Sequence, residues 1–487
     1  MAGLQKLLLC TATIAVFAAV GCRGTRQVRD AEYAHIASNI HYNDSFAAAE
    51  SAVPPTQGQF DGVQSLDRLV QFALSQNPEV QAARKRMEAA AHRVPVEASL
   101  PDPMLGVTAY PEQVQTAAGQ QELALNVNQK FPARRKLNTR AGVAESQTNV
   151  ARAELAAVEL AVVEQVKVSY YELFYIQQAI EITETEEEEL EKIRDTANAR
   201  YKANLTSQQD VLRADLELSN IANELIRLHQ QLDSTQAKLA RALHISPQTN
   251  LLASDQLLGE EAPQDLDWLE RRAVAARPEL HAKLAALERD RRTAQLARLD
   301  YVPDLTLGAT WIDTANAGIS PVANGQDAAL ITAGINLPIY RKRLDSAVRS
   351  AEANAVATAR QYDALRDATL EQVTDLFAKA RSQQDLLLLF REDILPKARQ
   401  TLEVSNRAYS VGEVDFLQLI DNFRLVLRYE VANSRLEASL RQTIASLERV
   451  VGGPLSQMAE SVPLPQSSEI EDMEENSMQL PEPALAE

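Results

Sequence analysis

The stretch from Arg134 to Lys202 restricts the possible folds more than any other part of this chain of 487 residues. Ala, Leu, Glu, Gln and Arg dominate the middle of the chain, and these residues favour helix. At a rise of about 1.5 Å per residue, one helix over this stretch is roughly 100 Å long. A compact globular domain does not contain such a helix, so the sequence predicts an elongated, mainly α-helical protein with a small β part.

The chain contains an internal repeat, because short motifs recur in the same order about 200 positions later. The recurring motifs are Asn77-Pro78-Glu79 and Arg277-Pro278-Glu279, Pro101-Asp102 and Pro303-Asp304, Phe131-Pro132 and Leu337-Pro338, Arg135-Lys136 and Arg341-Lys342, and Ala199-Arg200-Tyr201 and Arg407-Ala408-Tyr409. The first repeat is predicted at residues 65–250 and the second at residues 266–455.

Each repeat has the same predicted order of elements. A helix (66–98 or 267–299) precedes two strands (within about 101–131 or 303–337), and a long helical hairpin follows. The second helix of the first hairpin has a heptad seam that suits a neighbouring helix. The seam residues are Leu218, Ile221, Leu225, Leu228, Leu232, Thr235, Leu239 and Ala242. In the second hairpin, Pro396 predicts a kink.

The four predicted strands each have one apolar face and one face of small or polar residues. Large apolar residues alternate with small or polar ones in 123–128 and 305–311, and polar loops at 111–119 and 315–326 join the strands. This alternation suits a strand between lipid and a watery lumen, and by itself it also suits a soluble sandwich. The long helices favour the membrane, because a four-stranded sheet on such helices would leave exposed edges. Four strands cannot close a barrel, so a trimer with a shared twelve-stranded transmembrane β-barrel is predicted.

The two ends of the chain are predicted to lie outside the repeats. Residues 1–21 have the features of a lipoprotein signal peptide, with an apolar run too short to span a bilayer. Small residues precede Cys22 as in a lipobox, which implies cleavage there and attachment of lipid, including palmitate, to Cys22. The alternative is an ordinary signal peptide with an accidental cysteine. Residues 22–64 are predicted to be a linker from the anchor, and residues 456–487 an acidic disordered tail.

The sequence argues against an enzyme and against a nucleic-acid-binding protein. A net charge of −18 opposes binding to nucleic acid. The six histidines lack the spacing of a metal site, and no Cys pair or Gly-rich phosphate loop is present. No catalytic, metal or cofactor site is therefore predicted, and the glutamates within 184–191 are predicted to form a solvated helix face.

These motifs resemble the TolC family of outer-membrane efflux proteins, over roughly residues 65–453. The resembling segments are Asn77-Pro78-Glu79, the run from Leu100 to Gly106, Gln129-Lys130-Phe131-Pro132 and Lys136-Leu137. The chain is most similar to lipid-anchored members that serve resistance-nodulation-division pumps, in the heavy-metal and multidrug branch. The resemblance implies a homotrimer whose helices form a periplasmic tunnel below the barrel. It also implies a periplasmic adaptor and an inner-membrane pump as partners, and passive export of small solutes such as metal ions or drugs.

The turns of the two hairpins can be located from residue types. The breaks are predicted at Asn204 and Gly412, because both residue types tolerate the left-handed conformation that ends a helix. Ser207 and Asp415 are predicted to cap the helices that follow.

The resemblance further implies a gate next to these turns. Position by position, it places Asp210 and Asp421 in an acidic ring and Tyr409 in contacts between the hairpins. Gln418 and Val414 stand where relatives often have Asp and Arg. Three copies of Asp421 would attract cations. The alternative for each aspartate is a solvated carboxylate at a helix start, which is favoured for Asp210 and weighs equally with the ring for Asp421.

Other functions are weighed against the channel. A periplasmic adaptor lipoprotein would have one hairpin flanked by β-domains, whereas this chain has two hairpins. A structural coiled coil would have no use for amphipathic strands. Among outer-membrane ducts, an exit duct for secreted proteins is the alternative to a channel for small solutes.

Overall fold

The computed structural model describes residues 30, 33, 60–254, 262–316, 318, 319, 322 and 324–455. The chain divides into two units, and the larger unit contains every helix and strand named below. Residues 244–246 belong to the smaller unit. The predicted signal peptide, Cys22 and the acidic tail lie outside the described residues. Within the part of the chain that is described, no helix combines the length and the apolar character needed to cross a membrane.

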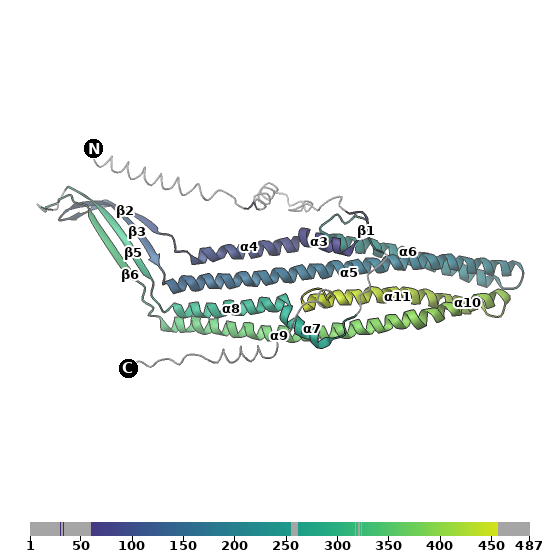
Figure 1. Cartoon of the computed structure of the whole chain (residues 1–487). Helices are drawn as coiled ribbons and strands as arrows, with labels where there is room; N and C mark the ends of the chain where they lie inside the picture. Colours follow the sequence, from purple (N-terminus) through teal and green to yellow (C-terminus); the bar gives the residue numbers. More distant parts are fainter. Residues whose placement is uncertain are drawn as a thin grey trace, which may run out of the picture. The chain divides into compact units, whose positions relative to one another are not determined.

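The two repeats contain helices and strands in the same order (Figure 1). The first repeat comprises α3 (Leu66–Gln76), α4 (Pro78–Ala98), β2 (Met104–Thr116), β3 (Gly119–Phe131), α5 (Arg134–Lys202) and α6 (Gln208–Leu243). The second comprises α7 (Leu266–Ala276), α8 (Pro278–Leu299), β5 (Leu305–Ala315), β6 (Ala328–Ile335), α9 (Arg341–Leu389), α10 (Leu395–Val411) and α11 (Phe416–Val451). Helix α5 begins and ends at the predicted residues.

The helix predicted before each pair of strands is broken once, so the prediction of one continuous helix is wrong. Asn77 and Arg277 have extended backbones, with ψ of 126° and 118°, directly before Pro78 and Pro278. A proline disfavours helical conformation in the residue before it, and its fixed φ suits the first position of a new helix. Asn77 also ties this break to the end of α6, because its side-chain amide donates a hydrogen bond to the carbonyl of Ala242 at 2.8 Å.

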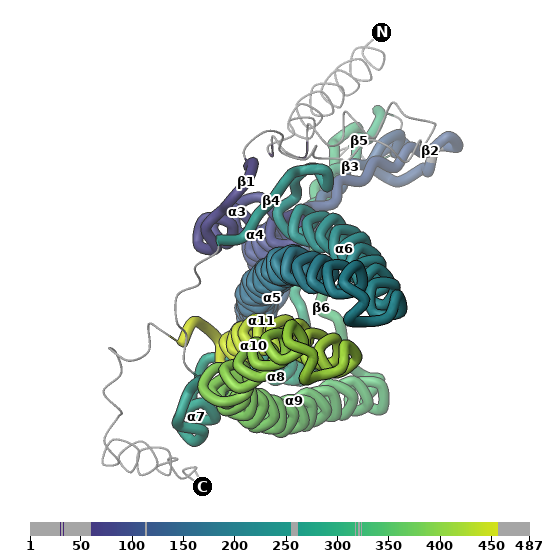
Figure 2. Tube along the Cα trace, turned by 90° about the vertical axis from the view of Figure 1, so that its right-hand side faces the viewer, coloured from purple at the N-terminus to yellow at the C-terminus, as the bar shows by residue number. Residues whose placement is uncertain are grey.

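The long helices pack in pairs, and the two hairpins also pack on each other. Helix α5 contacts α4, α6, α8 and α11, and α11 contacts α9 and α10 as well. Figure 2 shows α5 and α6 next to each other and α11 beside α10. The predicted seam of α6 is buried or half-buried, and its Ile221 and Leu228 share apolar clusters with Leu190 and Ile176 of α5. The heptad prediction is therefore confirmed.

The second long helix contains a π-helical turn where a kink was expected. Helix α9 continues into the π-helix η1 (Phe390–Ile394) and then into α10. Pro396 lies in the first turn of α10. A proline has no amide hydrogen and its ring clashes with the carbonyl four residues earlier, and a widened turn accommodates this clash.

The four strands of the repeats form one antiparallel sheet in the order β2-β3-β5-β6. Strands β3 and β5 connect the two repeats, with Asn128 opposite Gly308, while β2 and β6 are the edges. The prediction of a polar loop at 111–119 is wrong, because β2 continues to Thr116 and β3 begins at Gly119. The pairing of β2 and β3 tolerates this polar segment through a shift of register.

A second, two-stranded sheet was not predicted. Strand β1 (Gly62–Gln64) pairs in parallel with β4 (Leu251–Ala253). The prediction of an irregular linker up to residue 64 is thus wrong at its end, and β4 lies between the two predicted repeats. Tyr170 of α5 secures this sheet by donating a hydrogen bond to the carbonyl of Gln64 at 3.1 Å. Strands of three residues are too short for their alternation to be recognised in a sequence.

Candidate functional site at the hairpin tips

Both hairpins turn at the residues that were expected to break the helices. Asn204 has a φ of 55° and Gly412 a φ of 88°, so both adopt the left-handed conformation. The amide that follows each of them donates a hydrogen bond of 2.9 Å to a carbonyl in the last turn of the preceding helix. These bonds satisfy carbonyls that the helix end would otherwise leave without a partner.

The two turns differ in how the next helix is capped. The hydroxyl oxygen of Ser207 accepts a hydrogen bond from the amide of Gln209 at 3.2 Å, as predicted. Asp415 occupies the N-cap position of α11, but its side chain makes no capping hydrogen bond. The exposed carboxylate of Asp415 is left to the solvent, so the predicted cap is wrong at this position.

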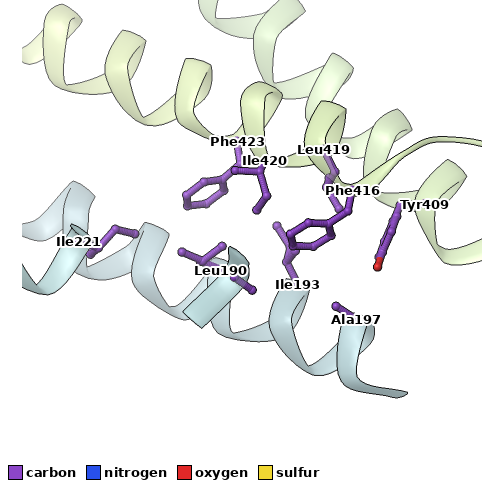
Figure 3. Packing of buried hydrophobic residues seen from close by; sticks show 10 residues of the cluster. Leu190, Ile193, Ala197, Ile221, Tyr409, Phe416, Leu419, Ile420 and Phe423 are labelled. Atoms are coloured by element: carbon purple, nitrogen blue, oxygen red, sulfur yellow. The ribbon is translucent and has the colours of Figure 1, made fainter. Parts of the chain in front are cut away.

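Apolar side chains from both hairpins form one buried cluster beneath the turns (Figure 3). Its buried members are Leu190, Ile193 and Ala197 of α5, Ala214 and Ile221 of α6, Tyr409 of α10, and Phe416, Leu419, Ile420 and Phe423 of α11. The ring of Tyr409 lies 5.3 Å from that of Phe416, between centroids. Because residues of both repeats share this cluster, the two hairpins are held side by side near their turns.

Tyr409 and Asp210 form a buried hydrogen bond between the hairpins. The hydroxyl of Tyr409 donates to a carboxylate oxygen of Asp210 at 3.2 Å, and the hydroxyl of Thr206 donates to the same carboxylate. Tyr409 is 2% exposed and Asp210 is 8% exposed. The prediction of a solvated Asp210 is therefore wrong, because the neighbouring hairpin covers it. Burial, followed by the charge of Asp210, raises the pKa of Tyr409 to about 12, so this hydroxyl keeps its proton near neutral pH.

Arg200 makes a second link between the hairpins. Its Cζ atom lies 5.0 Å from the centroid of the Tyr409 ring, and its Nη1 donates a hydrogen bond of 2.7 Å to the carbonyl of Ser410. A Cβ atom at Gly412 would lie 3.1 Å from Nη2 of Arg200. Glycine therefore serves two purposes at this position, the left-handed turn and the close approach of the guanidinium.

A bidentate ion pair provides a third link, between α11 and α6. Arg424 donates from Nε and Nη2 to the two carboxylate oxygens of Glu217, at 2.8 and 2.5 Å. The hydrogen bond from Arg424 lowers the pKa of the Glu217 carboxyl, against the opposing effect of burial, and a hydrogen bond from Asn220 adds to this lowering. Asp421 lies 3.6 Å from Nη1 of Arg424 with an exposed side chain, and Gln418 is exposed as well. Asp421 and Gln418 thus stay accessible in the single chain.

A further polar contact lies along α5, within the acidic segment. Glu186 is 7% exposed and faces Glu430 of α11, whose carboxylate accepts a hydrogen bond of 2.6 Å from Arg399 of α10. Burial, and then the charge of Glu430, raises the pKa of Glu186 to about 7. The prediction of a solvated face at 184–191 is wrong for Glu186, because the second hairpin covers it. It holds for the exposed members Glu184, Glu188, Glu189 and Glu191.

Sequence reasoning missed Arg200, Arg424 and Glu217. A signal existed for Glu217, because it follows Asp210 by seven positions and so lies on the same face of α6. Arg200 belongs to the recurring motif Ala199-Arg200-Tyr201, but neither arginine carries a signal for its partner, since arginines recur along all of these helices. Among the described residues, no group of three or more His, Cys, Asp or Glu is arranged to hold a metal ion. The contacts above hold one hairpin to the other.

Comparison with known proteins identifies similar proteins over most of the chain. The family profile described as "Outer membrane efflux protein" matches residues 69–243 and 269–453. The pyoverdine export outer membrane protein OpmQ of Pseudomonas putida is 21% identical over 409 residues, which are 80% of this chain and 86% of that protein. The cobalt-zinc-cadmium resistance protein CzcC of Cupriavidus metallidurans is 24% identical over 433 residues, covering 84% of this chain and 96% of that protein. The outer membrane protein VceC of Vibrio cholerae has a similar structure, with a TM-score of 0.68, 20% identity and coverage of 80% of this chain and 96% of that one.

Proposed function

The chain belongs to the outer membrane efflux protein family, and from this premise we propose that its hairpin tips are the closed periplasmic gate of a trimeric channel. The chain acts as the outer-membrane channel of a tripartite efflux system. Members of this family are transport conduits, so the adaptor, coiled-coil and enzyme alternatives are set aside. The observation that carries the gate proposal is the buried hydrogen bond between Tyr409 and Asp210, which joins the two hairpins next to their turns.

In the proposed assembly, three copies share one twelve-stranded barrel and a tunnel of twelve long helices. Each copy supplies the sheet β2-β3-β5-β6, whose two edge strands carry unpaired backbone groups in the single chain. Pairing of these edges between copies would satisfy those groups. The long helices would extend into the periplasm, with the turns at Asn204 and Gly412 at the far end.

Opening of the gate requires the second hairpin to move away from the first. The bonds to be broken are Tyr409 to Asp210, Arg200 to Ser410 and Arg424 to Glu217. A partner can drive this movement if it binds the separated hairpins more tightly than the closed ones. A periplasmic adaptor and an inner-membrane pump fit this role, so the channel needs no energy source of its own.

The anchor and the cargo complete the proposal. Residues 1–21 would be removed as a signal peptide, and lipid on Cys22 would attach the chain to the outer membrane through the following linker. The two repeats, 65–250 and 266–455, would form the channel. Small solutes such as metal ions or drugs are the proposed cargo. The names of the relatives, pyoverdine export and cobalt-zinc-cadmium resistance, accord with small cargo of more than one kind.

Single-channel conductance in a planar bilayer tests this function. The wild-type protein is expected to give small steps that favour cations, because three copies of the exposed Asp421 would surround the constriction. Asp421→Ala should weaken the cation preference. The control is Asp233→Ala, which removes an exposed carboxylate of α6 far from the turns. If the two variants have equal ion selectivity, Asp421 does not line the constriction. If inserted protein never conducts, even as the Tyr409→Phe variant, the proposed gate is contradicted.

A further inference from the structure

An ion cluster with a buried Lys136 and a buried Asp304 joins the two repeats where the sheet meets the helices. Nζ of Lys136, at the start of α5, lies 2.8 Å from Oδ1 of Asp304 and donates a hydrogen bond of 2.7 Å to the carbonyl of Val302. Lys130, near the end of β3, reaches Oδ2 of Asp304 at 3.0 Å. Both lysines belong to the first repeat, and Asp304 directly precedes β5 of the second. The cluster therefore fixes how one repeat follows the other.

The repeat contains a second copy of these partners, and they do not meet within one chain. Asp304 corresponds to Asp102 with a shift of 202 positions, and Lys136 corresponds to Lys342 with a shift of 206. Asp102 and Lys342 are both exposed, and neither forms an ion pair or a side-chain hydrogen bond with any described residue. Among the described residues this complementary pair of charges therefore has no partner, although Asp102 precedes the edge strand β2 and Lys342 follows the other edge strand, β6.

The register of the strands shows that residues related by these offsets in the sequence also occupy equivalent positions in the sheet. In the first hairpin of strands, Gly106 lies opposite Asn126. Adding 202 to the residue number in β2 and 206 to the residue number in β3 gives the equivalent pair in the second repeat, Gly308 opposite Thr332. This pair is found between β5 and β6. The two repeats are therefore equivalent down to single pairs of residues in the sheet.

The same shifts can be applied to the junction between the repeats. Strand β3 of the first repeat pairs with β5 of the second, with Asn126 opposite Thr310. The equivalent junction joins β6, the edge strand whose residues are all exposed, to the other edge strand, β2. These two edges lie on opposite sides of the sheet in one chain, so a second copy must supply one of them (Figure 1).

We propose that β6 of one copy pairs with β2 of the next in the register that β3 uses with β5, and that Lys342 of the first copy forms an ion pair with Asp102 of the second. Thr332 would then lie opposite Thr108 of the neighbouring copy. Lys342 would also reach the carbonyl of Leu100 there, as Lys136 reaches that of Val302. This interface rests on the proposed trimeric channel and specifies which residues of its copies meet.

Disulfide cross-linking of the full-length protein in membranes tests the register. The pair Thr108→Cys and Thr332→Cys in one chain should give covalent dimers and trimers on oxidation, because opposite residues in a sheet have the Cα separation that a disulfide needs. The control pair, Tyr110→Cys and Thr332→Cys, keeps both thiols on the same face but shifts the register by two residues, and should give much less product. Stronger cross-linking in the control pair, or none in either, would overturn the inference.

A charge exchange tests the ion pair. Lys342→Asp and Asp102→Lys should each give about fivefold more dissociated chain in detergent, and the two together should restore assembly. The control is Arg343→Asp, which reverses an adjacent exposed cation without an ion pair among the described residues. Failure of the double variant to recover would overturn the ion pair. If the wild-type protein is trimeric and conducts but the cysteine pairs do not cross-link, only this interface is overturned. If the wild-type protein is monomeric and does not conduct, the proposed channel is overturned as well.

Discussion

The hydroxyl of Tyr409 donates a hydrogen bond of 3.2 Å to Asp210, although the two residues are 199 positions apart in the chain. Each lies next to the turn of its own hairpin, and each is buried by the other hairpin. The bond can therefore exist only while the tips of the two hairpins are in contact. Burial, followed by the charge of Asp210, raises the pKa of the Tyr409 hydroxyl to about 12, so the hydroxyl keeps its proton near neutral pH. In the proposed gate, the contact would therefore open by movement of the hairpins and not by titration of Tyr409.

Removal of the Tyr409 hydroxyl should make the closed tips less stable. Tyr409→Phe keeps the ring in the apolar cluster but leaves Asp210 with fewer donors, which costs roughly 1–2 kcal/mol. The open probability in planar bilayers should rise about five- to thirtyfold. Tyr201→Phe is the control, because Tyr201 is 41% exposed beside the turn of the other hairpin. Equal open probabilities in the two variants would contradict a role of this bond in closure.

Loss of Arg424 should destabilise the contact between the hairpins, because it leaves the carboxylate of Glu217 buried without its main partner. Arg424→Met is expected to cost on the order of 2 kcal/mol. The double variant Arg424→Met with Glu217→Met should lose less than the single one, since it removes the buried charge too. Protection of the tips from limited proteolysis measures the effect. A double variant that is cut faster than Arg424→Met would contradict this explanation.

The Glu217 carboxyl should also make the stability of the contact between the hairpins depend on pH, with a sign that follows from its lowered pKa. Its pKa in the folded protein lies below the ordinary value of 4.5, chiefly because Arg424 donates to it. The stabilisation is therefore complete above the ordinary pKa and is lost as the pH falls through the lowered one. Proteolytic protection should drop at acidic pH in the wild type, and the drop should be smaller in Glu217→Gln. Identical pH profiles would exclude Glu217 as a contributor.

Glu186 should act in the opposite direction. Its pKa rises from the ordinary 4.5 to about 7 in the folded protein, first through burial and then through the charge of Glu430. The folded state then holds a proton that the unfolded state has lost, so stability falls as the pH rises from about 4.5 to 7. Glu186→Gln should raise the midpoint of thermal unfolding at pH 8 and change it little at pH 4. Glu184→Gln, at an exposed position of the same helix whose charge is not among the causes of the raised pKa, should change it little at either pH. An equal midpoint for wild type and Glu186→Gln at pH 8 would contradict the raised pKa.

Loss of Lys136 should lower the folding stability of the single chain, whereas loss of Lys342 should weaken the assembly of its copies. Lys136 is 3% exposed and holds Asp304 within the chain, so Lys136→Met leaves a buried carboxylate with one fewer partner and costs about 3 kcal/mol of folding stability. Lys342→Met should leave the folding of the single chain unchanged and weaken its assembly. Thermal unfolding and the fraction of dissociated chain, measured on both variants, separate the two effects. Equal loss of folding stability in the two variants would contradict this distinction.

The sequence by itself determined the elements whose causes are local. The bounds of α5 followed from helix-forming composition, the seam of α6 from its heptad spacing, and the turns at Asn204 and Gly412 from the left-handed conformation that these residue types tolerate. The breaks at Pro78 and Pro278 carried a local signal as well, which the prediction of continuous helices overlooked. The recurrence of motifs predicted two repeats, and the helices and strands of the structure recur in the same order.

Only the tertiary structure decided which residues of one hairpin meet those of the other. Asp210 is predicted to be a solvated carboxylate at a helix start, and Glu186 one of several exposed glutamates. In the structure each is covered by a helix of the second hairpin, 199 positions away for Tyr409 and Asp210. Arg200 and Arg424 gain their partners in the same way. The pairing of β1 with β4 also joins short segments that are distant in the chain. Such contacts depend on how the long helices twist around each other, and that geometry arises from the packing of whole helices rather than from any local stretch of sequence.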